Sequence, residues 1–104
     1  MPRGPVWGAA SEDLNATMLV WGPGEGPEEH VNTERDVLYV VVDGTASLTV
    51  DGTLHDLRHG DALIVPKGTS RLLVAGEDGV RYVTAHRRRG GLQIRRASTT
   101  RDAT

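Results

Sequence analysis

The segment Gly24–Asp36, GEGPEEHVNTERD, concentrates side chains that are able to bind a metal ion. After Glu25 it offers one imidazole, one amide and four further carboxylates, from His30, Asn32, Glu28, Glu29, Glu34 and Asp36. Imidazole nitrogens and carboxylate oxygens are common ligands of divalent metals in proteins. The segment is therefore a candidate metal site, and a second segment, Gly60–Arg71 (GDALIVPKGTSR), decides whether the site is complete.

The elements around these segments are expected to be strands, because helical periodicity is nearly absent and apolar runs are punctuated by Gly, Pro and Asp. The clearest predicted strands are Leu14–Trp21, Val37–Val42, Ala62–Val65, Arg71–Ala75 and Val80–His86. The run VLYVVV at Val37–Val42 is typical of a strand that is covered on both faces. Many short strands at close spacing predict an all-β sandwich or barrel.

A hairpin is expected over ASLTVDGTLHDL, since Asp51-Gly52 is a strong signal for a two-residue turn. The predicted register has three pairs: Val50 with Thr53, Leu48 with His55, and Ala46 with Leu57. This register places Ala46, Leu48, Val50 and Leu57 on one face.

The first segment follows a spacing that is known from a protein family. It has Gly24, five residues, His30-x-Asn32, three residues, Asp36, seven residues and Gly44. This resembles the first motif of the single-domain cupins of the conserved-barrel type, which is Gly, five residues, His-x-His, three or four residues, Glu, six residues, Gly. The resemblance implies an all-β fold, an antiparallel jelly-roll β-barrel.

The second segment resembles the second cupin motif, which is Gly, five residues, Pro-x-Gly, two residues, His, three residues, Asn. Here Gly60 is followed by Pro66-x-Gly68, then Arg71, then Ala75. The glycine and proline positions agree closely, and the likeness spans roughly residues 14–86. It implies that both motifs meet at one end of the barrel interior. Cupins include enzymes, sugar-binding modules and storage proteins, so the likeness does not fix a function.

The metal ligands that the resemblance implies are three His and one Glu, and most of them are replaced. Only His30 agrees; Asn32 replaces a His, and Asp36 replaces the Glu, unless counting back from Gly44 puts Val37 there. We therefore expect either no cofactor or a weakly held Mn, Fe, Ni or Zn ion at His30, Asn32 and Asp36.

Arg71 argues most strongly against that ion. A guanidinium stays charged and has no lone pair to donate. At about 5 Å and an effective dielectric of about 20, it would repel a divalent ion by about 6–7 kcal/mol. Three alternatives remain for Arg71: an internal ion pair with Asp36 or Glu34, recognition of a carboxylate or phosphate on a ligand, or exposure to solvent.

Three other side chains bear on a ligand site. Trp21 is a candidate for one wall, and His86 for a second imidazole at the end of its strand. The alternatives are packing for Trp21 and exposure or packing for His86. We interpret Tyr39 as a core or interface residue. The catalytic residues are unknown: there is no Cys and no Ser-x-Gly elbow, and His30 beside Asp36 is either a general base or a buried hydrogen bond.

The length of 104 residues predicts one domain. We assign residues 1–13 to an N-terminal extension, 14–89 to the cupin barrel and 90–104 to a basic tail. Residues 1–86 carry six Lys and Arg but 13 Asp and Glu, whereas residues 87–104 carry six Arg and one Asp. The net charge is −2 and the tail has no aromatic residues, so nucleic-acid binding is not expected.

No apolar run reaches the roughly 20 residues of a membrane span, and the N-terminus lacks the pattern of a secretion signal, so we expect a cytoplasmic protein. The apolar strands and the frequency of isologous dimers predict a homodimer. The favoured function is binding of a small polar or anionic molecule through His30, Asn32 and Arg71. The alternatives are a metal-dependent enzyme of isomerase or dioxygenase type, and a regulatory module that acts through the Arg-rich tail. Whether the protein is an enzyme stays open.

Overall fold

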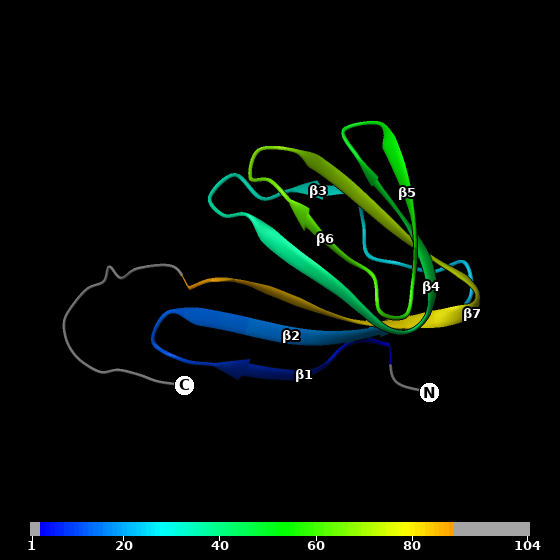
Figure 1. The fold of residues 1–104 in the computed structure, drawn as a ribbon, viewed down its shortest axis with the longest axis horizontal. Coiled ribbons are helices and arrows are strands. Elements are labelled where there is room, and N and C mark those ends of the chain that lie inside the picture. The colour runs from blue at the N-terminus through cyan, green and yellow to red at the C-terminus, as the bar shows by residue number, and fades with distance from the viewer. Residues whose placement is uncertain (1–2, 89–104) are drawn as a thin grey trace.

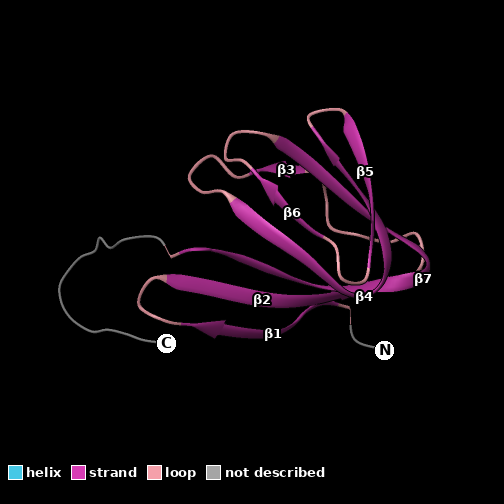
Figure 2. Cartoon of the chain, in the orientation of Figure 1, coloured by secondary structure: helices cyan, strands magenta, loops and turns pink. Residues whose placement is uncertain are grey.

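The computed structural model describes residues 3–88, and within this range every regular element is a strand (Figure 2). The strands are β1 (Gly4–Ala10), β2 (Leu14–Trp21), β3 (His30–Val31), β4 (Val37–Val50), β5 (Thr53–Arg58), β6 (Ala62–Val65) and β7 (Ser70–Arg87). The predicted all-β class is confirmed. The described residues include no helix long and apolar enough to cross a membrane.

The two longest strands, β4 and β7, bend and pair with partners on both sides of the molecule (Figure 1). Residues 37–44 of β4 and 80–87 of β7 join β1, β2 and β6 in the order β1-β2-β7-β4-β6, which we call sheet I. Residues 46–50 of β4 and 70–75 of β7 join β3 and β5 in the order β3-β7-β4-β5, which we call sheet II. All these pairs are antiparallel, as the predicted jelly-roll barrel requires.

The bend between the two sheets depends on Gly44. Its φ is +79°, and a Cβ atom at this position would overlap the carbonyl oxygen of Gly79 on β7. The β4–β7 register shifts on both sides of Gly44, between Val41 and Asp43 and again before Ala46. Glycine is therefore needed here both for the positive φ and for the close approach of the two backbones.

The β4–β5 hairpin has the predicted register. Val50 pairs with Thr53, Leu48 with His55, and Ala46 with Leu57. Both turn residues have positive φ, 46° at Asp51 and 84° at Gly52, as a type I′ turn requires. Ala46, Leu48 and Leu57 are buried and Val50 packs against the core, so this face was predicted correctly.

The core lies between the two sheets and takes alternate residues of β4. Val37, Tyr39 and Val41 are buried, whereas Leu38 and Val42 on the other face are exposed. The expectation that Val37–Val42 is covered on both faces is therefore wrong for a single copy of the described residues. The physical reason is that this part of β4 belongs to sheet I, whose second face has no layer packed on it among residues 3–88.

The predicted N-terminal extension, residues 1–13, contains a strand that the sequence analysis missed. Residues 4–10 form β1 and pair along the length of β2, so the sheet begins before residue 14. Apart from Gly4, the residues of β1 are exposed, and its sequence GPVWGAA has no alternation of apolar and polar residues that would indicate a strand. The predicted tail, residues 90–104, lies outside the described residues, as does the end of the predicted barrel at residue 89.

Candidate functional site

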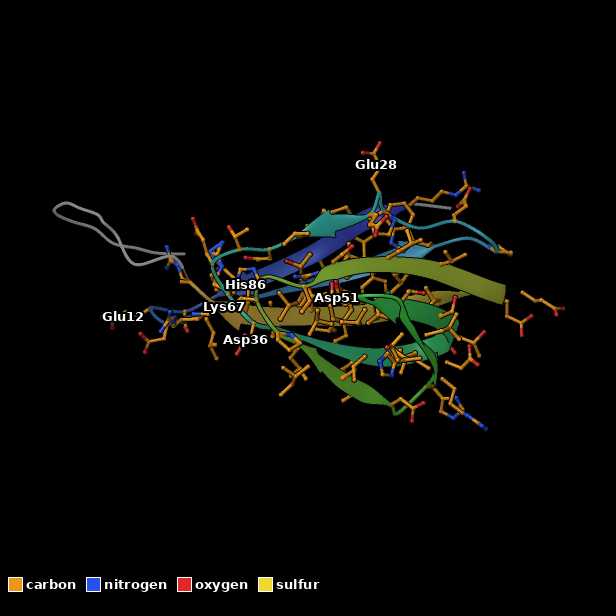
Figure 3. All side chains as sticks on the ribbon, turned by 90° about the horizontal axis from the view of Figure 1, so that it is seen from above. Glu12, Glu28, Asp36, Asp51, Lys67 and His86 are labelled. Carbon is orange, nitrogen blue, oxygen red and sulfur yellow. The ribbon has the colours of Figure 1, made fainter. Side chains whose placement is uncertain are left out.

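The two motif segments meet at one end of the barrel. His30 of β3 pairs with Arg71 of β7. The carbonyl oxygen of Asn32 accepts a hydrogen bond from the Gly68 N–H at 2.8 Å. Asp36 Oδ1 accepts one from the Lys67 N–H at 2.9 Å, and these two residues are labelled in Figure 3. Backbone pairing and these two contacts therefore hold the loop before β4 against the loop before β7.

Arg71 is buried between the sheets, with 3% of its surface exposed. The backbone of Arg71 belongs to sheet II, and its side chain reaches toward sheet I. Its Nη1 lies 3.5 Å from the hydroxyl oxygen of Tyr39, which belongs to sheet I. Its Nε and Nη2 are buried and have no hydrogen-bond partner among residues 3–88. The alternative that Arg71 is exposed to solvent is therefore wrong, and two of its three nitrogens are left unsatisfied.

The expected internal ion pair of Arg71 is also absent from the described part of the chain. Asp36 accepts a hydrogen bond from the Lys67 backbone, and Glu34 Oε1 lies 3.5 Å from Nη1 of Arg35. The ion pairs between described residues are Arg3–Glu25 and Arg35–Glu34, so none includes Arg71. A buried cation without a counter-charge is costly. Within residues 3–88 the site therefore carries one uncompensated positive charge.

The three predicted metal ligands are arranged in a way that does not fit a metal ion. Asn32 Oδ1 accepts hydrogen bonds from the backbone N–H groups of Glu34 and Arg35 at 3.0 and 3.1 Å. Asp36 Oδ1 is engaged by Lys67, and His30 is exposed. Across residues 3–88, no three His, Asp or Glu side chains are grouped so that they could hold an ion. The amide and the carboxylate hold loops together instead.

A row of aromatic side chains leads to Arg71 through Tyr39, the member that contacts it. Trp21 donates a hydrogen bond from Nε1 to the hydroxyl oxygen of Tyr82 at 3.1 Å. The rings of Tyr82 and Tyr39 stack, with centroids 5.8 Å apart and planes inclined by 20°. Burial raises the pKa of Tyr82 to about 12, and the hydrogen bond from Trp21 lowers it in part. Tyr82 is therefore a neutral phenol at physiological pH.

Tyr39 and Tyr82 were missed as site residues by the sequence analysis. The interpretation of Tyr39 as a core residue agrees with its burial, but Tyr39 is also the residue that contacts the Arg71 guanidinium. The sequence did contain one indication of this role. Tyr39 alternates with Val37 and Val41 along its strand, so it lies on the same inward face. A tyrosine at an inward position brings a hydroxyl group into the core, and a buried hydroxyl usually has a polar partner.

His86 makes a local contact instead. It is half-buried, its Nδ1 lies 3.0 Å from the carbonyl oxygen of Arg87, and it pairs with Asn15 of β2. Trp21, by contrast, is linked to the Arg71 region through Tyr82 and Tyr39. Of the predicted ligand residues, Arg71, Trp21 and His30 are thus connected by contacts or strand pairing, and Asn32 and His86 are engaged locally.

Comparison with known proteins gives concordant results. Residues 17–85 match the cupin domain family. The chain is 32% identical over 74 residues to dimethylsulfoniopropionate lyase DddW of Ruegeria pomeroyi, a match that covers 71% of this chain and 48% of DddW. The chain thus spans about half the length of that curated relative.

Solved structures agree with this result. KdgF from Halomonas sp. is similar with a TM-score of 0.73 and 26% identity, over 79% of this chain and 74% of KdgF. An RmlC-like cupin from Shewanella frigidimarina has a TM-score of 0.68 at 22% identity, over 75% of this chain and 68% of the other, and this likeness concerns the fold alone. The predicted cupin fold is confirmed.

Proposed function

The chain belongs to the cupin family, and we propose that it binds a small anionic molecule inside the barrel without a resident metal ion. One observation carries this proposal: Nε and Nη2 of Arg71 are buried and have no hydrogen-bond partner among the described residues. A buried guanidinium gains most from an anion that accepts its hydrogen bonds. Arg71 is therefore the residue that would recognise the ligand.

The neighbours of Arg71 supply further contacts. His30 pairs with Arg71 across β3 and β7, and paired residues lie on the same face of a sheet. His30 is exposed, so it would meet the ligand at the boundary with solvent. Trp21 and the two tyrosines would form an aromatic wall. We assign no ligand role to Asn32 or His86, because their side chains are engaged locally.

The similarity to DddW supports a ligand that carries a carboxylate group. The name of that enzyme gives a propionate as its substrate, and a propionate carries a carboxylate. The lyase activity of DddW is not transferred to this chain, because the chain spans about half the length of DddW. The support therefore concerns the carboxylate group of the ligand and not its net charge.

The test compares the thermal stability of the wild type and Arg71→Met in the presence of propionate, inorganic phosphate or sulfate. We expect at least one anion to raise the melting temperature of the wild type and to leave Arg71→Met unchanged. Arg58→Met is the matched control, because Arg58 is an exposed arginine at the end of β5, and it should respond like the wild type. An equal response of Arg71→Met and the wild type would contradict the proposal.

A metal-dependent enzyme that uses His30 with Asn32 or Asp36 is the second candidate; the name of DddW supports an enzyme, and it does not name a metal. Metal analysis of protein purified without a metal-affinity column separates the two. Stoichiometric Mn, Fe, Ni or Zn in the wild type that is lost in His30→Ala would overturn the metal-independent proposal. A regulatory module that acts through residues 90–104 is the third candidate, and deletion of these residues tests it. A cytoplasmic location stays a prediction.

A further inference from the structure

The two unpartnered nitrogens of Arg71 belong to the same edge of its guanidinium group. Nη1 is the nitrogen that lies near Tyr39, at 3.5 Å, and Nε and Nη2 are the two that remain. In a planar guanidinium, the Nε–H and one N–H of Nη2 point in parallel directions. This edge is the fork that binds two oxygens of one planar group at once.

We propose that this edge of Arg71 binds a monocarboxylate, with one carboxylate oxygen on Nε and the other on Nη2. The inference rests on the proposed function and narrows its ligand from a small anion to a carboxylic acid. Tyr39 is then a positioning residue: its hydroxyl contacts Nη1, on the side of the guanidinium away from the free edge, and so orients the fork.

The charge of the barrel interior favours a monoanion. Arg71 is the charged side chain that is buried among the described residues, and neither ion pair between those residues includes it. One carboxylate neutralises one guanidinium. A phosphate group carries about −1.5 to −2 charges at neutral pH, so its excess charge would stay buried without a partner.

The surroundings of the fork favour an organic acid with an apolar body. Tyr39 and Tyr82 stack beside Arg71, and Tyr82 already has the Trp21 indole N–H as its hydrogen-bond donor. These rings offer apolar faces rather than additional cationic donors. A short carboxylic acid would therefore place its carboxylate on Arg71 and its carbon chain against the tyrosines.

The experiment titrates ¹⁵N-labelled full-length protein and follows the Arg71 Nε–H resonance, which is assigned from its loss in Arg71→Lys. Three probes separate shape from charge: propionate, ethanesulfonate, which is a monoanion with three oxygens, and inorganic phosphate. We expect propionate to shift the Nε–H resonance and to saturate, and to bind roughly tenfold or more tightly than the other two probes. Arg71→Lys keeps the charge but loses the fork, so it should weaken propionate binding roughly tenfold or more.

Each outcome decides something different. Tighter binding of phosphate or ethanesulfonate through Arg71 would overturn the carboxylate inference and leave the proposed function standing. If no probe moves the Nε–H resonance, and Arg71→Met responds to anions like the wild type, both would be wrong.

Tyr39→Phe tests the positioning role. This variant should weaken propionate binding while its spectrum stays that of a folded protein, and unchanged binding would contradict the role. If Arg71→Lys fails to fold, the Nε–H resonance is assigned in the wild type through the bonds of the side chain. The wild-type titration with the three probes then decides the carboxylate inference without any variant.

Discussion

Arg71 and Tyr39 connect the two sheets of the barrel, since the Arg71 guanidinium leaves sheet II and its Nη1 lies 3.5 Å from the Tyr39 hydroxyl on sheet I. In the cupin pattern, position 71 is the last metal-ligating His. Here a fixed positive charge occupies this position and has no counter-charge among residues 3–88. The chain thus keeps a cationic centre in the barrel, although the chemistry of that centre differs from that of a metal ion.

An uncompensated buried charge lowers the stability of the ligand-free protein. Arg71→Met removes this charge and keeps an apolar side chain, so we expect the free energy of unfolding to rise by about 1–3 kcal/mol. Urea denaturation in a buffer without carboxylate or phosphate measures this change. Arg58→Met, at an exposed position, should stay within about 0.5 kcal/mol of the wild type. A loss of stability in Arg71→Met would mean that the guanidinium has a stabilising partner.

The raised pKa of Tyr82 predicts a loss of stability at high pH. Burial raises this pKa from 10.0 to about 12, so the folded protein holds the proton more tightly than the unfolded chain does. Below pH 10 both states are protonated and the full stability is present. As the pH rises from 10 to 12, the unfolded chain ionises first, and the free energy of unfolding falls by about 2–3 kcal/mol.

Denaturation at pH 10 and at pH 12 tests this expectation, with Tyr82→Phe as the comparison. The variant has no phenol at this position, so it should lose less stability than the wild type over the same interval. An absorbance titration should also show that the Tyr82 phenol ionises near pH 12. Equal losses in both proteins would contradict the prediction.

The Trp21–Tyr82 hydrogen bond should contribute measurably to stability. Trp21→Phe removes the donor and leaves the Tyr82 hydroxyl without it, and Tyr82→Phe leaves the indole N–H without its acceptor. A double-mutant cycle that adds Trp21→Phe/Tyr82→Phe isolates the pair from the packing that each change also alters. We expect a coupling energy of about 0.5–1.5 kcal/mol by urea denaturation. A coupling energy of zero would mean that the Trp21–Tyr82 hydrogen bond does not contribute to the free energy of unfolding.

Local patterns were sufficient to predict much of the fold. The Asp51-Gly52 turn determined the hairpin register, because the turn and the alternation of apolar residues specify the same pairing. The glycine and proline skeleton identified the family, since positions such as Gly44 are determined by backbone geometry. Strand β1 was missed because GPVWGAA contains two Gly and one Pro and does not alternate between apolar and polar residues.

The site was harder to predict, because its contacts join residues that are far apart in sequence. The sequence identifies Arg71 as a departure from the cupin pattern, but its burial and missing ion pair depend on how the two sheets face each other. Asn32 has the residue type of a weak ligand, yet its side chain accepts two nearby backbone N–H groups, as Asn often does in turns. Val42 is an extra residue on β4 that has no partner on β7, and this bulge gives a physical reason for the longer spacing between Asp36 and Gly44.

The loop role of Asn32 can be separated from a ligand role. Asn32→Ala removes the acceptor for the Glu34 and Arg35 N–H groups and should cost about 1–2 kcal/mol of unfolding free energy. Asn32→Asp keeps an acceptor oxygen and should retain most of the stability. Both measurements are made by urea denaturation in the presence of a chelator. If Asn32→Ala has the same free energy of unfolding as the wild type under these conditions, the two backbone contacts of Asn32 do not stabilise the loop.

The outer face of sheet I carries two neighbouring apolar rows, each of which crosses all five of its strands. Strand pairing aligns Ala62, Val40, Val83, Met18 and Trp7 in one row, and Ile64, Leu38, Ala85, Ala16 and Ala9 in the next. Ile64 and Trp7 are 63% and 53% exposed. An apolar face of this extent suits burial against another surface.

We propose a second copy of the chain as the occupant of this face, because an apolar surface is self-complementary and isologous pairs are the commonest assembly. Ile64→Lys places a charge within the face and should raise the dimer dissociation constant on the order of tenfold or more. Light scattering coupled to gel filtration over a concentration series measures the assembly state. Leu54→Lys is the matched control: Leu54 is similarly exposed, at 58%, but lies on β5 in sheet II, so its dimer should match the wild type. A wild type that stays monomeric at every concentration, or an equal effect of both variants, would contradict this assignment.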